Sequence, residues 1–166
     1  EADKQFMDYY VGQKEVAVTG KIEGVEFKGK IDCLNVEKGY FVDIKTTKSD
    51  IDSMVWVQDE ASGRNVQVRW FEAWGYVLQM AAYKKMLEEQ YGKEFTPIIY
   101  VVTKESAPDT RAIVFQTQEK LGYELTELSM LIKHLDKVKR GEEKAKPCGH
   151  CEYCKSKALS QRVEVI

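Results

Sequence analysis

Apolar and polar residues alternate along the front part of the chain in the way that β-strands require. Between residues 15 and 35, β-branched and aromatic side chains occur at about every second position, and Glu23-Gly24 interrupts them. A period of two is typical of a strand with one buried face. Glu37-Lys38-Gly39 is a second turn signal, so short connections would join the strands into an antiparallel meander. The predicted strands are at about residues 15–22, 25–35 and 40–46.

The spacing becomes helical near the middle of the chain. Residues 67–91 carry apolar side chains at helical spacing, including Trp70 and Trp74, and Gly92 follows as a stop signal. The stretch before it, residues 47–65, is polar with a short apolar island, and we interpret it as a loop with at most a short helix. The remaining predicted elements are strands at residues 96–103 and 111–116 and a helix at about residues 118–139.

The predicted order of elements, β-β-β-α-β-β-α, favours one α/β sandwich around a mixed sheet flanked by helices. Neither GxGxxG nor GxxxxGK[ST] occurs in the sequence, so glycine loops of those two kinds are absent. The chain begins with Glu1 rather than Met, and we expect residues to be missing upstream. We predict one domain over residues 1–140 that lacks its front part. Residues 141–166 would be a basic, cysteine-rich segment packed on the same domain.

Composition indicates an ordinary globular protein with unevenly distributed charge. Of 166 residues, 43% are hydrophobic and 31% are charged, a balance typical of a folded domain. No apolar run approaches the ~20 residues of a membrane span and no apolar leader is present, so we expect a cytoplasmic protein without a membrane partner. The net charge is −2, but residues 1–60 carry 8 Lys and Arg against 13 Asp and Glu, and residues 132–166 carry 9 against 5. A chain of this size can show such a distribution by chance, and the distribution also fits an acidic metal site and a tail that contacts a polyanion.

Two aspartates and a lysine interrupt the predicted strands in a pattern that suits hydrolytic chemistry. Asp32 breaks one apolar strand, Asp43 breaks the next, and Lys45 follows Asp43 on the same strand face. Neighbouring carboxylates repel each other, and a hard cation such as Mg²⁺ resolves that conflict. The lysine would orient or deprotonate an attacking water, or stabilise charge on a phosphate. Taken one at a time, these residues are equally compatible with a solvated surface.

The long predicted helix adds polar groups on one face. Gln79 and Tyr83 are one helical turn apart, and Arg69, Glu72 and Tyr76 lie along the same polar stripe. Gln79 offers an amide donor and acceptor, and Tyr83 offers a hydroxyl on an aromatic ring. A mixed face of this kind is also common at the boundary of an ordinary helix.

Three motifs together resemble a known nuclease superfamily. They are Gly29-Lys30-Ile31-Asp32, Phe41-Val42-Asp43-Ile44-Lys45-Thr46-Thr47 and Gln79-Met80-Ala81-Ala82-Tyr83, and they span residues 29–83, about a third of the chain. In this order they resemble the PD-(D/E)xK nucleases, in particular the RecB-like branch with phage-type exonucleases of the exodeoxyribonuclease VIII kind. The resemblance implies a restriction-endonuclease-like core and a nuclease that depends on Mg²⁺, with Mn²⁺ as a substitute.

The resemblance also implies roles for individual residues. Asp32, Asp43 and the backbone carbonyl of Ile44 would bind the metal. The family commonly has an earlier His or Glu on a helix, and Glu15 is the acidic stand-in that this chain offers, although it lies at a predicted strand start. The implied catalytic set is Asp32, Asp43, Lys45, Gln79 and Tyr83.

A cysteine cluster near the C-terminus forms a second candidate site. Cys148, Cys151 and Cys154 are spaced as CxxCxxC with His150 among them, which suits zinc or an iron–sulfur cluster. Some RecB-branch nucleases carry such a cluster, with one further cysteine before the nuclease motifs. The earlier cysteine here, Cys33, is next to Asp32, and we expect it to pack in the core. The alternative is three reduced cysteines in a short turn. The candidate DNA-contacting lysines in this region are Lys144, Lys146, Lys155 and Lys157.

These observations favour a metal-dependent exonuclease that acts on linear double-stranded DNA in phage-type recombination or repair. From the resemblance we also expect a single-strand annealing protein as a partner and a homo-oligomeric ring. One alternative is an endonuclease or an RNA-directed nuclease of the same fold. Another is a non-catalytic module that binds DNA or is organised by metal at the cysteines.

Overall fold

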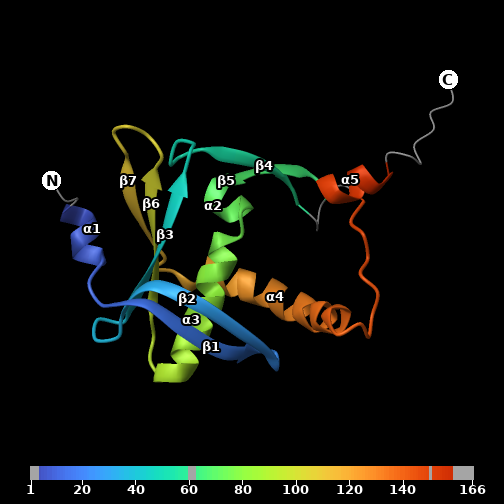
Figure 1. The fold of residues 1–166 in the computed structure, drawn as a ribbon, viewed down its shortest axis with the longest axis horizontal. Coiled ribbons are helices and arrows are strands. Elements are labelled where there is room, and N and C mark those ends of the chain that lie inside the picture. Colours follow the sequence, from blue (N-terminus) through green and yellow to red (C-terminus); the bar gives the residue numbers. More distant parts are fainter. Residues whose placement is uncertain (1–3, 60–62, 150, 159–166) are drawn as a thin grey trace. The chain divides into compact units, whose positions relative to one another are not determined.

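The computed structural model describes residues 4–59, 63–149 and 151–158, and it divides the chain into two compact units, residues 1–130 and 131–166. Figure 1 shows the elements in chain order. The helices are α1 (Lys4–Tyr9), α2 (Trp70–Ala73), α3 (Tyr76–Tyr91), α4 (Gln118–Lys139) and α5 (Glu152–Ala158). The strands are β1 (Gln13–Ile22), β2 (Val25–Asn35), β3 (Tyr40–Thr47), β4 (Met54–Gln58), β5 (Asn65–Arg69), β6 (Thr96–Thr103) and β7 (Thr110–Val114).

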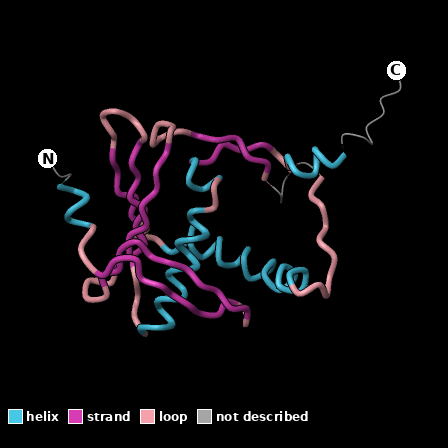
Figure 2. Tube along the Cα trace, viewed as in Figure 1, coloured by secondary structure: helices cyan, strands magenta, loops and turns pink. Residues whose placement is uncertain are grey.

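The first unit is built on a five-stranded mixed sheet with the strand order β1-β2-β3-β6-β7. β1, β2 and β3 form the predicted antiparallel meander, and β7 is antiparallel to β6. The β3–β6 pair is parallel, and a long crossover that contains α3 connects these strands, whereas connections of two to six residues join the antiparallel neighbours. Figure 2 shows the strands of this sheet crossed by the helix. The predicted α/β class with a mixed sheet is confirmed.

Two apolar clusters cover the two faces of the sheet. α3 packs against β1 and β6, and the buried core there includes Phe41, Met80 and Ile99. The second cluster consists of Cys33, Val42, Ile98 and Tyr100. α1 covers this second cluster, with its Phe6 ring edge-on to the Tyr100 ring at a centroid distance of 5.1 Å. Cys33 is fully buried, as predicted.

The interpretation of residues 47–65 as a loop was wrong. β4 pairs antiparallel with β5 in a separate two-stranded sheet. Val55 and Val57 are half-buried, whereas their neighbours on β4 are exposed, so β4 has the period of two that a strand requires. The period covers too few residues to stand out from the polar sequence around it. β5 also occupies the first residues of the region that was predicted to be helical.

The long helix begins at Tyr76 rather than at residue 67. Gly75 adopts a left-handed conformation with φ 70° and separates α2 from α3, which a residue without a Cβ permits at little cost. Because the helix is broken there, Trp74 does not continue the buried face and is 70% exposed, contrary to the prediction. Gly92 ends α3 in a left-handed conformation, as predicted.

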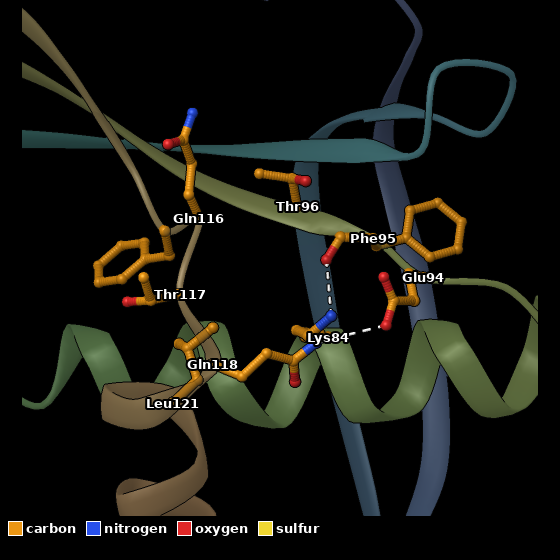
Figure 3. Close-up of a pocket in the computed structure, with 9 residues that line it drawn as sticks. Lys84, Glu94, Phe95, Thr96, Gln116, Thr117, Gln118 and Leu121 are labelled. Carbon is orange, nitrogen blue, oxygen red and sulfur yellow. Dashed lines mark hydrogen bonds between the residues drawn. The ribbon is translucent and has the colours of Figure 1, made fainter.

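A buried lysine joins α3 to the start of β6. Lys84 is 7% exposed, donates a hydrogen bond to the carbonyl of Phe95 at 3.0 Å and pairs with Glu88. Figure 3 shows the small pocket beside it, where Gln118 donates to Glu94 at 3.5 Å. The pocket has a volume of about 60 Å³, which is room for water rather than for a substrate. Lys84 is therefore a structural residue whose charge is satisfied locally.

The second unit contains the end of α4, a charged turn and α5. Glu143 accepts hydrogen bonds from Lys137 at 2.9 Å, and its Oε2 lies 2.6 Å from Nδ1 of His134. These contacts fold the turn back on the last part of α4. In the described part of the chain, no helix is both long enough and apolar enough to cross a bilayer.

Candidate active site

The two strand aspartates face each other where β2 and β3 separate. The β2–β3 pairing ends at Cys33 and Val42, so the next pair in the same register is Asp32 and Asp43. Directly opposite residues of an antiparallel pair share a face of the sheet. Asp32 Oδ2 accepts a hydrogen bond of 2.7 Å from the backbone N–H of Ile44. The Asp32 carboxylate thus replaces the backbone partner that Ile44 loses as the strands diverge.

β2 is irregular at Asp32. Ile31 and Leu34 both belong to the cluster beneath α3, although residues three apart on a regular strand face opposite sides. On the neighbouring strand, Glu15 lies between the pairs Lys14–Cys33 and Val16–Ile31 with a left-handed φ of 55°. The two irregularities lie side by side, next to the point where the pairing of β2 with β3 ends.

Glu15 is an exposed residue of β1 rather than part of a helix. Its carboxylate pairs with Lys30, and more than half of each side chain is exposed. No three carboxylates of the described residues bring their oxygens together within one cluster, so Glu15 does not join Asp32 and Asp43 in a compact set. Its role as a metal ligand stays a prediction.

A chain of polar contacts connects Asp43 to α3. Lys45 Nζ lies 2.6 Å from Asp43 Oδ2 and donates a 2.8 Å hydrogen bond to Gln79 Oε1. Gln79 Nε2 in turn donates to the Tyr83 hydroxyl at 3.0 Å. The Lys45 ammonium also lies 4.3 Å from the centroid of the Tyr76 ring, a distance suited to a cation–π contact. The Lys45 ammonium thus contacts Asp43, Gln79 and Tyr76 at the same time.

Asp43 carries a buried oxygen without a hydrogen-bond donor. The residue is 4% exposed, and its Oδ2 is ion-paired with Lys45 Nζ at 2.6 Å but receives no hydrogen bond of regular geometry from the described residues. Burial raises the pKa of the Asp43 carboxyl, the nearby Lys45 ammonium opposes the shift and Asp32 adds to it. A buried carboxylate oxygen without a donor, opposite a second carboxylate, is a suitable ligand set for a hard divalent cation.

Gly29 allows Tyr83 to reach the site. A Cβ placed on Gly29 would lie 2.2 Å from Cε1 of the Tyr83 ring and 2.9 Å from its hydroxyl oxygen. The first motif therefore requires glycine because the tyrosine of the third motif packs directly on its backbone. The sequence showed both residues but not this contact, which joins β2 to α3.

Tyr76 is the residue of the site whose role sequence reasoning did not identify. It was placed only on the polar stripe of the helix, yet its ring covers the Lys45 ammonium. The available signal was its position one helical turn before Gln79. The two other members of that stripe bind elsewhere, since Glu72 pairs with Lys120 and Arg69 pairs with Asp52.

The three C-terminal cysteines cluster in the second unit. Their sulfur atoms all lie within 4.8 Å of one another, and Cys148 and Cys154 are in contact at 3.7 Å. A backbone hydrogen bond from Gly149 lowers the pKa of the Cys154 thiol, but its contacts with Cys151 and Cys148 and its partial burial outweigh this effect and raise it. His150 lies outside the described residues. The nearby lysines are all exposed, namely Lys144, Lys146, Lys155 and Lys157.

The structure is similar to a crystal structure from Eubacterium rectale described as a "Putative exonuclease". The two align with a TM-score of 0.78 and 30% sequence identity, over 99% of this chain and 57% of the other. The chain thus spans little more than half the length of that protein. The structure of SSO0001 aligns with a TM-score of 0.45 and 14% identity, over 93% of this chain and 62% of the other, which is too distant to inform function. No curated protein matches the sequence.

A family model covers nearly the whole chain. The PDDEXK-like domain of unknown function (DUF3799) matches residues 1–157, a range that includes Asp32, Asp43 and Lys45. The match confirms the resemblance that the three sequence motifs indicated. The chain therefore belongs to this family of PDDEXK-like domains, and with it to the PD-(D/E)xK nuclease superfamily.

Proposed function

We propose that this domain is a Mg²⁺-dependent exonuclease of the RecB-like branch that hydrolyses phosphodiester bonds of linear double-stranded DNA. The observation that carries the proposal is the buried Asp43 oxygen, which lies 2.6 Å from Lys45 Nζ and has no hydrogen bond of regular geometry. Family membership and the description of the Eubacterium rectale protein support nuclease chemistry. Phage-type recombination or repair in the cytoplasm, with a single-strand annealing protein as partner and a homo-oligomeric ring as assembly, completes the proposal.

Each residue of the site has a role in this proposal. Asp32, Asp43 and the carbonyl of Ile44 would hold Mg²⁺, or Mn²⁺ in its place. When bound, the metal supplies Lewis-acid polarisation of the phosphate and lowers the pKa of a coordinated water. Lys45 orients the attacking water or stabilises charge that develops on the phosphate. Gln79, itself held by Tyr83, fixes the lysine.

The proposal predicts metal-dependent loss of linear duplex DNA. End-labelled linear duplex incubated with the full chain should be degraded with Mg²⁺ or Mn²⁺ and stay intact with EDTA, because without a cation the carboxylates repel the negatively charged phosphodiester. Label release is followed over time. Covalently closed circular DNA of the same sequence is the control and should remain uncut. Cutting of the circle at an equal rate would indicate an endonuclease, and degradation of RNA in preference to DNA would contradict the DNA assignment.

We also propose that the cysteine cluster binds zinc or an iron–sulfur cluster through Cys148, Cys151 and Cys154. Three sulfur atoms within 4.8 Å of one another supply most of a tetrahedral thiolate site. His150 is the candidate fourth ligand from the sequence. The exposed lysines near the cluster would contact DNA phosphates.

If the three cysteines bind a metal, substitution of one of them should release that metal. Protein purified without chelators should contain about one metal site per chain, and Cys151→Ser should lose it, because the remaining donors cannot complete the coordination shell. Elemental analysis and visible absorption distinguish zinc from iron–sulfur. The matched control is Cys33→Ala, which removes a buried cysteine from the sheet core and should retain the metal. Metal-free wild-type protein, or equal loss in both variants, would contradict a metal site here.

A further inference from the structure

A groove adjoins the candidate active site within the first unit. It has a volume of about 770 Å³ and lies between the end of β3, the loop after it, β4 and α2. Thr46 and Thr47 follow Lys45 directly on β3 and line the groove, and so does Tyr76, whose ring covers the Lys45 ammonium. The groove therefore begins next to Lys45 on β3 and shares Tyr76 with the candidate active site.

The chemistry of the groove is suited to an anionic chain with flat apolar groups. Its polar lining consists of Lys48 and Lys104 and of hydroxyl side chains, and none of the described residues that line it carries a carboxylate. This is notable because the front part of the chain is acidic. The apolar lining is made by Val55 and Val57 of β4 together with Trp70 and Trp74.

Trp74 is presented to solvent on a fixed turn. Its side chain is 70% exposed, whereas its backbone N–H donates to the carbonyl of Trp70 at 3.1 Å and that of Gly75 donates to Glu72 at 2.9 Å. An exposed indole on a hydrogen-bonded turn leaves apolar surface in water, and its backbone has little freedom left to lose on binding. Such a residue is typical of a contact site rather than of the core.

The wall of the groove is held in place before any ligand arrives. Ile51, in the loop after β3, is 1% exposed, and its carbonyl accepts a 2.9 Å hydrogen bond from the Trp70 indole. Asp52 pairs with Arg69 at 2.8 Å and with Arg111 at 2.6 Å. The loop is thus tied to α2, β5 and β7, so the groove is preformed.

We propose that this groove binds unpaired nucleotides of the DNA strand that is being cut, with the Trp74 indole stacking on a base and Lys48 and Lys104 contacting phosphates. This inference rests on the proposed nuclease function. Grooves of roughly 300–1,000 Å³ hold small ligands, so the volume suits a few nucleotides and not a duplex. Aromatic platforms beside lysines are the usual means of binding single strands, whereas the base faces of a duplex are covered by its own stacking. Unpaired nucleotides seated here would lead directly to Lys45.

The test measures binding separately from cleavage. Fluorescence anisotropy of a short labelled oligothymidylate is recorded with the full chain in EDTA, where cutting does not interfere. Trp74→Ala should raise the Kd roughly tenfold, equivalent to about 1.4 kcal/mol, because a stacked base is lost. Trp74→Phe should recover most of the affinity, since it keeps an aromatic face. A blunt duplex of the same strand should bind Trp74→Ala and wild type with similar affinity.

Trp56→Ala provides the matched control. Trp56 is 65% exposed on β4, which forms one wall of the groove, but it does not line the groove, so its removal should change the Kd less than about twofold. Unchanged oligothymidylate binding by Trp74→Ala, or equal loss with Trp56→Ala, would overturn the proposal. Because binding is measured without metal, Trp74-dependent affinity can be observed even if DNA is never cut. If the chain cuts DNA but its affinity for the oligonucleotide does not depend on Trp74, the proposed nuclease function is retained and the proposed binding role of the groove is wrong.

Discussion

Replacing Lys45 with methionine is expected to slow Mg²⁺-dependent cleavage of linear duplex DNA by about a thousandfold. Methionine keeps the length of the side chain but removes the ammonium that lies 2.6 Å from Asp43 and donates to Gln79. Losses of this size are usual when a group that transfers a proton or stabilises developing charge is removed. Initial rates of label release from end-labelled duplex measure the effect. The control is Lys28→Met, which replaces an exposed lysine of β2, and this variant should cut at the wild-type rate.

Asp43→Asn should cause a comparable loss of cleavage without lowering stability. One carboxylate oxygen is buried, with an ion pair to Lys45 but no hydrogen bond of regular geometry, and the raised pKa of Asp43 means that its charge costs stability as the pH rises above the unfolded value. The metal-free variant should therefore melt no lower than wild type at neutral pH. Mg²⁺ should raise the Tm of wild type and not that of the variant, because ligands stabilise the state that binds them.

Two results would contradict these roles. If Lys45→Met or Asp43→Asn cleaves DNA at the wild-type rate, the substituted residue has no catalytic role. A Mg²⁺-dependent rise in Tm that persists in Asp43→Asn would place the metal elsewhere. In either case the fold assignment would stand, because it rests on the sheet and on the family match.

Gly29→Ala should destabilise the domain and disable the site together. The new Cβ would meet the Tyr83 ring at 2.2 Å, so the ring must move, and Gln79 would lose the hydroxyl to which it donates. Overpacking of this kind costs about 1–3 kcal/mol. The displaced Gln79–Lys45 contact should slow cleavage roughly a hundredfold, as small misplacements of catalytic groups do. Urea denaturation and the labelled-duplex assay measure the two effects.

A double variant separates the contact from other effects of alanine. Tyr83→Ala removes the ring, so adding Gly29→Ala to it should cost almost no further stability. Gly122→Ala in α4 is the matched glycine control, since a Cβ there meets nothing within 4 Å, and it should slightly stabilise the helix. Additive losses in the double variant would show that Gly29 matters for a reason other than Tyr83.

Much of the fold could be predicted because its signals are local. The meander of β1, β2 and β3 follows from a clear period of two and from short turns, and α4 follows from an uninterrupted helical period. The β4–β5 hairpin could not be predicted in the same way. The alternation of exposed and half-buried residues in β4 covers few positions. The hairpin is stabilised by packing on α2, which belongs to the region predicted to be helical, whereas β4 belongs to the region predicted to be a loop. The start of α3 depends on one backbone angle at Gly75.

The sequence by itself determined the chemistry of the candidate site. It placed Asp32, Asp43 and Lys45 on adjacent strands and Gln79 and Tyr83 on one helix face, because side-chain direction is fixed by the periods of strand and helix. Only the tertiary structure decided how these groups meet. The divergence of β2 from β3 turned the Asp32 carboxylate onto the Ile44 amide.

Contacts between distant segments were likewise decided by the fold alone. Burial left one Asp43 oxygen without a donor, and Gly29 made room for Tyr83. The break at Gly75 exposed Trp74 beside the groove. Each of these features depends on residues far apart in sequence that packing brings into contact, and neither local period nor spacing carries that information.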